Sequence, residues 1–296
     1  MSKAHPPTFT RYIPIVFVLL WSTGFVGAKF GLPYAEPFTL LMWRMVFVVP
    51  LFVILIIILK RPKISVFDAS IQALVGILIH GIYLGGVFAA IDANMPTGLA
   101  ALITSLNPLL LAVFSGMVLS TTINRREWLG LSLGLLGTAI VLYGASSWEG
   151  AITTKGLLWL LITLPAMVAG TLIQKRYAQN VDLITGSSYQ YGSALLFFSL
   201  LSFTVETGVV DWSFTFVATL AWLIIVLSFI AIFLLLYMIR HGEATRVASY
   251  FYLVPPFTAF QGWLFFDEKW SWLTVAGTIL VIGALAMNRP KKDIIR

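Results

Sequence analysis

A few polar side chains interrupt otherwise apolar segments of the chain. His80 and Tyr83 are three residues apart, which places them on one face of a helix. The imidazole of His80 either hydrogen-bonds a ligand, takes up a proton near physiological pH, or stays neutral and supports a neighbouring helix. Polar groups are costly in hydrocarbon, so such positions indicate a functional site.

Two cations, Lys29 and Arg44, also lie within apolar segments. Either could attract a carboxylate, and the planar fork of Arg suits one best. The alternative for Lys29, which lies near the end of its segment, is to extend its ammonium to the membrane surface. The alternative for Arg44 is to cap backbone carbonyls or to pair with Glu36 or Asp92.

Amide and aromatic side chains provide further candidates for ligand contacts. The amides of Asn107 and Gln190 can read a carboxylate or an amine. Aromatic rings in mid-segment either pack or hold an apolar group or an ammonium by cation–π contact. We therefore add the following rings to the candidate binding residues: Trp21, Tyr83, Trp159, Tyr189 and Tyr252.

Pro108 and Pro255 form a separate pair of candidates. Each lacks an N–H and so frees a carbonyl one turn earlier in its helix. They either act as hinges where helices bend or simply shape the bundle.

Several chemistries have no raw material in this chain. There is no Cys, which excludes disulfides, thiol nucleophiles and thiolate metal sites. The three His residues are too scattered for a metal site, and no nucleophile-elbow or phosphate-loop motif occurs. We expect no enzyme activity, no cofactor and no metal, and without a phosphate loop we expect any work by this chain to be driven by an ion, a proton or a solute gradient.

The composition explains where these residues must reside. Of the 296 residues, 59% are hydrophobic and 10% charged, which excludes a soluble enzyme, a disordered chain and a nucleic-acid-binding module. A bilayer span needs about 20 apolar residues. The sequence therefore predicts an all-α integral membrane protein in contact with the lipid bilayer.

Ten apolar stretches of span length are bounded by charges, Pro or Gly. They lie at 13–31, 38–59, 70–90, 97–119, 128–145, 156–174, 185–205, 215–238, 247–266 and 270–288. With a cytoplasmic N-terminus, fifteen Lys and Arg residues fall in inner loops and two in outer loops. This bias predicts that both termini are cytoplasmic, and it accounts for most of the net charge of +7.

The chain also matches itself. At an offset of about 147 residues Pro108 aligns with Pro255, and at 146 Arg44 aligns with Gln190. We therefore predict two five-helix repeats, 13–150 and 151–289, between a stub (1–12) and a basic tail (290–296). Because five is odd, the second repeat enters the membrane from the opposite side, as in inverted-repeat transporters.

The residues in this pattern resemble the EamA-type exporters of the drug/metabolite transporter superfamily over nearly the whole chain. The resemblance is carried by Trp21–Phe25, Trp43–Arg44, Pro96–Pro108, Val247–Pro255, Asp267–Glu268, Gly277 and Gly283. It implies ten helices and efflux of amino acids, related metabolites or drugs. One departure is Ser120–Thr121, where the first repeat of the family often has an acid.

The sequence-based hypothesis is an inner-membrane secondary transporter that exports amino acids or similar small metabolites by alternating access. No Asp or Glu lies within a predicted span, which favours neutral or zwitterionic solutes over organic cations. Two alternatives stay open: a drug or xenobiotic exporter and a non-transporting membrane scaffold. The expected partners are the small-molecule solute and the bilayer, with proton coupling open and a single copy sufficient.

Overall fold

The computed structural model describes residues 12–119, 124–145, 153–241, 250–266 and 271–287. Within these residues every regular element is a helix, and the one β pairing is an isolated bridge between Ala35 and Val210. The acid pair Asp267–Glu268, its counterpart Ser120–Thr121, and the predicted tail 290–296 lie outside the described residues.

The helices of the first half follow the predicted apolar stretches closely. They are α1 (Ile13–Gly31), α2 (Pro37–Ile58), α3 (Val66–Gly76), the π-helical η2 (Ile77–Tyr83), α4 (Leu84–Asp92), α5 (Thr97–Thr104), α6 (Asn107–Leu119) and α7 (Arg125–Ala145). The segments α3, η2 and α4 form one continuous helical run, which is longer than the predicted 70–90.

The second half has a similar order of elements. They are α8 (Thr154–Tyr177), α9 (Leu183–Val205), α10 (Phe214–Trp222), the π-helical η3 (Leu223–Ala231), α11 (Ile232–His241), the 3₁₀-helical η4 (Phe251–Leu253), α13 (Val254–Phe266) and α14 (Trp272–Met287).

Six helical runs in the described chain are long and apolar enough to cross a membrane. They are Ile13–Gly31, Pro37–Ile58, Val66–Asp92, Thr97–Val118, Thr154–Tyr177 and Phe214–Leu235. Large apolar side chains are exposed along them, such as Ile57 at 69%. A soluble protein would not present such surfaces, so the chain is a multi-pass integral membrane protein. The total of ten spans stays a prediction.

The two candidate hinge prolines lie at helix starts. The predicted stretch 97–119 is divided in the structure, where α5 ends at Thr104 and α6 begins at Asn107. Pro108 has no N–H to continue the ladder, and it is tolerated in the first turn of a new helix. Pro255 is likewise the second residue of α13, directly after η4.

Corresponding features of the two halves recur at the offset found in the sequence. The starts of α2 and α9 are 146 residues apart, as are the starts of η2 and η3, while α7 and α14 start 147 apart. Two π-helical segments at matching positions are unusual, because π-helix is rare in proteins. Where it does occur, it often lies at a functional site.

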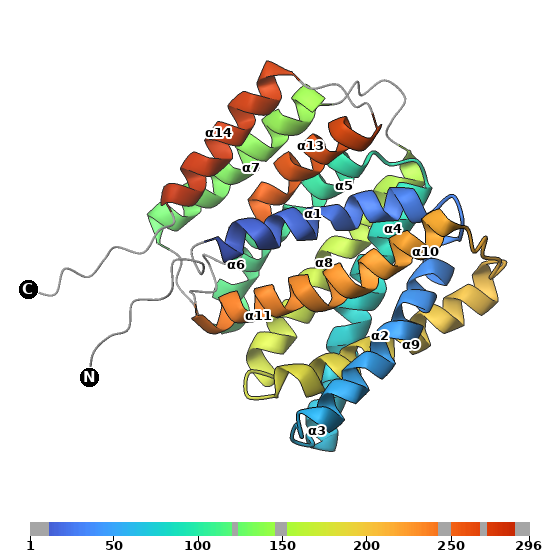
Figure 1. Cartoon of the computed structure of the whole chain (residues 1–296). Helices are drawn as coiled ribbons and strands as arrows, with labels where there is room; N and C mark the ends of the chain where they lie inside the picture. Colours follow the sequence, from blue (N-terminus) through green and yellow to red (C-terminus); the bar gives the residue numbers. More distant parts are fainter. Residues whose placement is uncertain (1–11, 120–123, 146–152, 242–249, 267–270, 288–296) are drawn as a thin grey trace, which may run out of the picture.

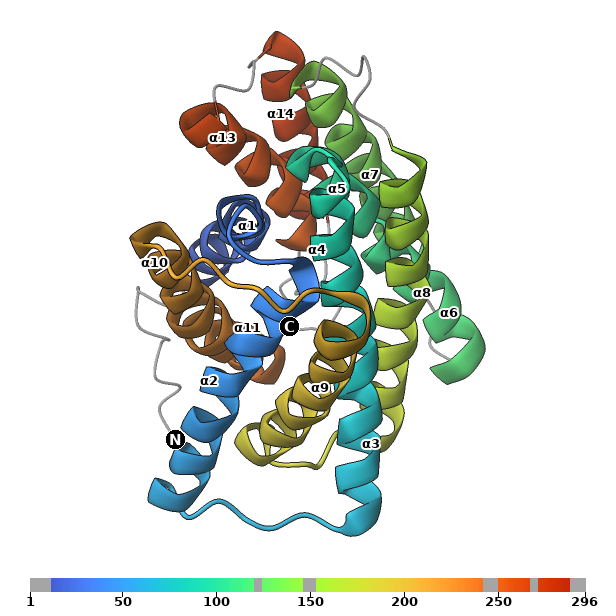
Figure 2. The same cartoon turned by 90° about the vertical axis from the view of Figure 1, so that its right-hand side faces the viewer.

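Two pairs of corresponding helices lie side by side. Figure 1 shows α7 (green) beside α14 (red) at one edge of the bundle and α2 (blue) beside α9 (gold) at the other. The first pair is in backbone contact, since a Cβ added at Gly137 would lie 2.8 Å from the carbonyl oxygen of Gly277. Figure 2 shows α9 flanked by α2 and α3.

Candidate functional site

A polar cluster lies inside the bundle where α3, η2, α8 and α9 meet. Its centre is Gln190 on α9, whose amide nitrogen donates to Gln72 Oε1 at 2.6 Å and to Gln174 Oε1 at 2.9 Å. The amide oxygen of Gln190 lies 3.2 Å from His80 Nε2. An amide oxygen only accepts, so in this arrangement His80 carries its proton on Nε2. The four side chains form one connected network.

Tyr191 extends the cluster towards α2. Its ring stacks on the imidazole of His80, with centroids 4.4 Å apart and an interplanar angle of 23°. The same ring also stacks on Phe52 of α2, at 5.2 Å. Tyr191 is 1% exposed, so the stack is shielded from solvent.

Arg44 of α2 is a buried cation at the edge of the cluster. Its side chain is 6% exposed, and Nε donates to the Ser228 hydroxyl of η3 at 3.0 Å. Ser228 in turn donates to the Leu223 carbonyl at 3.2 Å. The expected alternative partner Glu36 instead accepts from the Thr207 amide at 2.7 Å. Within the described chain Arg44 forms no ion pair.

The close approach of α3 to α9 brings the cluster together. A Cβ added at Gly76 would lie 2.3 Å from the Gln190 carbonyl oxygen and 2.4 Å from Ser193 Oγ, so only Gly fits. Ser193 also donates to the Ala73 carbonyl of α3 at 2.8 Å. The π-helical segment η2 begins at the residue after Gly76, and it places His80 on the face that meets α9.

The equivalent residues Gln190 and Arg44 perform corresponding tasks. Gln190 on α9 contacts His80 in η2, and Arg44 on α2 contacts Ser228 in η3. Each π-helical segment is therefore held by a side chain from one of the two paired helices. The chemistry differs, because one contact is amide to imidazole and the other is guanidinium to hydroxyl.

The other predicted site residues lie in separate contacts. Trp21 packs against Phe17 and Phe251 with ring centroids 5.3 and 5.4 Å away, and Trp159 packs against Phe38 at 5.9 Å. These rings belong to aromatic packing on α1 and α8.

Tyr83 and Tyr189 have different surroundings. Tyr83, in η2, is half-buried and interacts with Thr104 at the end of α5. Tyr189 is 43% exposed and points away from the polar cluster, although its neighbour Gln190 lies at the centre of that cluster.

Two predicted residues have unpartnered polar atoms. Tyr252 is 1% exposed and packs on Gly134 of α7, where its hydroxyl has no hydrogen-bond partner among the described residues. Asn107 Oδ1, at the start of α6, is likewise buried and unpartnered within the described chain. Lys29 places its ammonium 4.1 Å from the centroid of the Phe266 ring.

Four residues in and around the cluster were not predicted from the sequence: Gln72, Gln174, Tyr191 and Ser228. Gln72 and Gln174 lie near the ends of predicted spans, where a polar residue raises no suspicion. A count of amides would have found them, because three of the five Gln residues in the chain meet here. Ser228 had no signal, because Ser is common in membrane helices.

Two clasps join the ends of the α2–α9 pair. At one end Glu206 accepts hydrogen bonds from the amides of Phe38 and Thr39 at 2.8 and 2.7 Å, and from the Thr39 hydroxyl at 2.8 Å. This carboxylate caps the N-terminus of α2, where a negative charge is favoured. We call this the Glu206 clasp, and it includes the Glu36–Thr207 contact.

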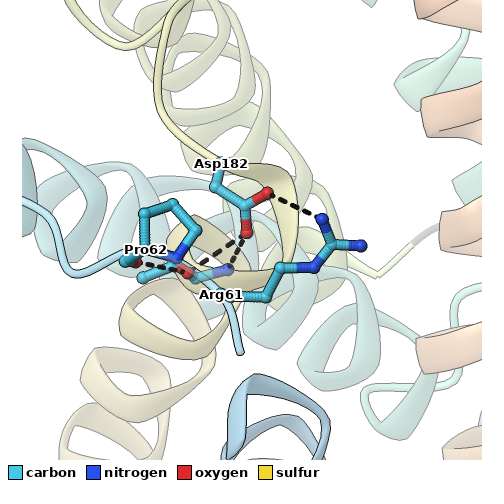
Figure 3. A network of polar contacts seen from close by, with 4 residues as sticks. Arg61, Pro62 and Asp182 are labelled. Atoms are coloured by element: carbon cyan, nitrogen blue, oxygen red, sulfur yellow. Dashed lines mark hydrogen bonds and ion pairs between the residues drawn. The ribbon is translucent and has the colours of Figure 1, made fainter. Parts of the chain in front are cut away.

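At the other end, Asp182 caps the N-terminus of α9 through the Thr185 amide at 3.0 Å. Figure 3 shows its second oxygen facing Arg61, at 3.7 Å, in the segment after α2. The Thr185 hydroxyl also donates to the Pro62 carbonyl at 3.1 Å. We call this the Asp182 clasp. The two clasps correspond at the offset of the repeat, because Asp182 is 146 residues after Glu36 and Thr207 is 146 residues after Arg61.

A membrane-embedded helical bundle with a buried polar network has the features of a solute transporter. Comparison with known proteins agrees. The chain belongs to the EamA-like transporter family, which matches residues 12–143 and 154–289. Family membership indicates a transporter rather than an enzyme.

Relatives align along most of the chain. The uncharacterized transporter YvbV of Bacillus subtilis is 24% identical over 98% of this chain and 94% of its own length. A probable amino-acid metabolite efflux pump of Salmonella typhimurium is 24% identical over 94% and 93%. The uncharacterized inner membrane transporter YedA of Escherichia coli is 26% identical over 75% and 74%. A solved crystal structure shares the fold, with a TM-score of 0.73 at 19% identity over 95% of this chain and 96% of the other.

Proposed function

We propose that this transporter exports amino acids or similar small metabolites across the inner membrane by alternating access. The observation that carries the proposal is the buried polar cluster around Gln190, which joins helices of both halves. The cluster offers amide, imidazole and guanidinium groups but no carboxylate. Such groups recognise the carboxylate and ammonium of a zwitterion.

Alternating access in this proposal arises from two inverted five-helix halves, 13–150 and 151–289, in ten spans. The pattern of helix contacts supports it. In the first half α1 contacts α10, η3 and α13, and in the second half the corresponding α8 contacts α3, η2 and α6. Exchanging the halves therefore preserves the contacts, as a pseudo-two-fold axis requires.

The proposed orientation places both termini in the cytoplasm. The excess of Lys and Arg in the loops on that side supports it. The Asp182 clasp then lies on the cytoplasmic side and the Glu206 clasp on the outer side. Opening the solute path to either side would break the clasp on that side while the other stays closed.

Two observations support the solute class. Arg44 is a buried cation without an acidic partner in the described chain, and a buried charge needs a counter-charge. A solute carboxylate would supply it. Relatives in Salmonella typhimurium and Escherichia coli carry the name probable amino-acid metabolite efflux pump.

Counterflow in proteoliposomes tests the proposal. Purified protein is reconstituted and exchange is measured against a panel of amino acids and aromatic cations at two pH values. We expect exchange of one or more amino acids, and we expect Gln190→Leu to abolish it. Gln261→Leu is the matched control, since Gln261 hydrogen-bonds Ser22 outside the cluster.

Three results would contradict the proposal. Exchange of aromatic cations alone would indicate a drug exporter, and no exchange of any solute would favour a scaffold. Equal activity of the Gln190 and Gln261 variants would remove the cluster from the solute path. In addition, His80→Gln should abolish the pH dependence of exchange if His80 is the proton site, and an unchanged pH dependence would exclude that role.

A further inference from the structure

A groove of about 630 Å³ runs along the outer face of α9. Its floor is a stripe of α9 that includes Ser188, Gly192 and Leu196, and its walls come from Ile56 on α2 and Ala73 on α3. Figure 2 shows the order of the three helices that line it, with α9 (gold) between α2 (blue) and α3 (cyan). The groove is separate from the polar cluster, because no residue of the cluster around Gln190 lines it.

The floor of the groove is open. A Cβ built on Gly192 would meet nothing within 4 Å, and Leu196 is 74% exposed. The stripe from Thr185 to Leu196 covers twelve residues of α9, and the eleven helical rises between its ends amount to about 16 Å. One leaflet contributes about 15 Å of the hydrocarbon core. The groove thus has the length of a lipid tail in a single leaflet.

The mouth of the groove carries positive charge. Arg61 and Lys63, which follow the end of α2, line it together with Pro62. No Asp or Glu is among the described residues that line this groove. Arg61 reaches Asp182 at 3.7 Å with its side chain 39% exposed, and in the described chain Lys63 forms no ion pair. Both cations are therefore accessible to an anion at the level where the helix ends.

We propose that the groove binds one anionic phospholipid. Its phosphate lies between Arg61 and Lys63, and one acyl chain lies along α9 over Gly192. Basic pockets beside apolar helix surfaces recognise anionic headgroups in this way. With the orientation proposed above, the lipid belongs to the cytoplasmic leaflet, but the binding itself does not depend on the solute.

The position of the lipid also connects it to the polar cluster. The floor helix α9 carries Gln190, and the wall helix α3 contacts it through Gly76. The hydrogen bond from Ser193 to the Ala73 carbonyl joins floor and wall inside the groove. A bound lipid therefore stabilises the α3–α9 contact that assembles the cluster.

Native mass spectrometry of the full chain tests the proposal. The detergent-solubilised protein is titrated with phosphatidylglycerol and, separately, with phosphatidylcholine. We expect one tightly bound phosphatidylglycerol molecule per chain and weaker binding of phosphatidylcholine. Arg61→Gln and Lys63→Gln should each weaken phosphatidylglycerol binding about fivefold and leave phosphatidylcholine unchanged.

A blocking variant completes the test. Gly192→Phe fills the groove at a position with free space, so it should fold and lose both lipids. Gly283→Phe on α14, where a Cβ also meets nothing within 4 Å, is the matched control and should bind as the wild type does.

Three results would overturn the proposal: equal binding of the two lipids, unchanged binding by Gly192→Phe, or displacement of the lipid by millimolar inorganic phosphate. The last result would indicate a free-anion site. Because binding is measured without transport, failure here leaves the proposed function untouched, and failure of counterflow leaves this site untouched.

Discussion

Replacing Gly76 with Ala tests whether the approach of α3 to α9 assembles the polar cluster. The added Cβ would lie 2.3 Å from the Gln190 carbonyl oxygen and 2.4 Å from Ser193 Oγ. Ordinary contacts need roughly 3.5 Å, so the helices must separate by about 1 Å. The Gln190–Gln72 and Gln190–His80 hydrogen bonds, at 2.6 and 3.2 Å, would then exceed their useful range.

The expected loss of stability follows from these displacements. Overpacking costs about 1–3 kcal/mol, and each lost hydrogen bond costs about 1 kcal/mol. Ala gains about 1 kcal/mol over Gly within a helix, which leaves a net destabilisation of about 2–4 kcal/mol. At roughly 2–4 °C per kcal/mol, the midpoint of thermal unfolding should fall by about 5–15 °C.

The assay is thermal unfolding of the purified protein in detergent, with counterflow activity measured in parallel. Gly283→Ala is the control, because its Cβ meets nothing within 4 Å and Ala should slightly raise the midpoint. Adding Ser193→Ala to Gly76→Ala removes the contact with Ser193 Oγ, one of three atoms within 3.0 Å of the added Cβ, and should recover part of the loss. Equal midpoints for the Gly76 and Gly283 variants would refute the reasoning.

Three further predictions concern the clasps and the buried cation. Glu206→Ala should lower the free energy of unfolding by about 2–4 kcal/mol, because three hydrogen bonds at the start of α2 are lost. The control Glu127→Ala, at an exposed capping box, should change the free energy of unfolding by under about 1 kcal/mol. Similar unfolding midpoints for the two variants would contradict the capping role of Glu206. A double-mutant cycle of Arg61→Ala and Asp182→Ala should give a coupling below about 1 kcal/mol, because the pair is partly exposed, and a larger coupling would show a stronger clasp than its geometry indicates. Ser228→Ala leaves the guanidinium of α2 without its acceptor and should cost about 1–3 kcal/mol in thermal unfolding, while Ser228→Thr, which keeps a hydroxyl, should cost less; the reverse order would exclude the hydrogen bond as the cause.

Much of the helical framework is visible in the sequence. Apolar runs bounded by charges predicted α1 and α2 to within a residue or two, because a backbone in lipid must satisfy its own hydrogen bonds. The resemblance to the EamA family is confirmed as well, since the family matches residues 12–143 and 154–289. The offset of 146–147 residues anticipated where corresponding helices start.

The composition of the candidate site was only partly predictable. His80, Gln190 and Arg44 were found because polar groups within apolar runs stand out. Their partners Gln72 and Tyr191 were not predicted. Sequence spacing shows which residues share a helix face, but it does not show which face meets another helix. Tyr252, predicted as one of several rings within apolar stretches, packs on Gly134.

The sequence by itself determined that this chain is a helical membrane protein with a duplicated plan, because hydrophobicity and self-similarity are properties of the chain, and its resemblance to the EamA family indicated a transporter. Tertiary structure alone decided which polar groups meet. That choice depends on a Gly at position 76 that lets two backbones touch and on π-helical turns that shift the register of η2 and η3. Each acts between segments far apart in the chain or alters helix register locally, and hydropathy does not report either effect.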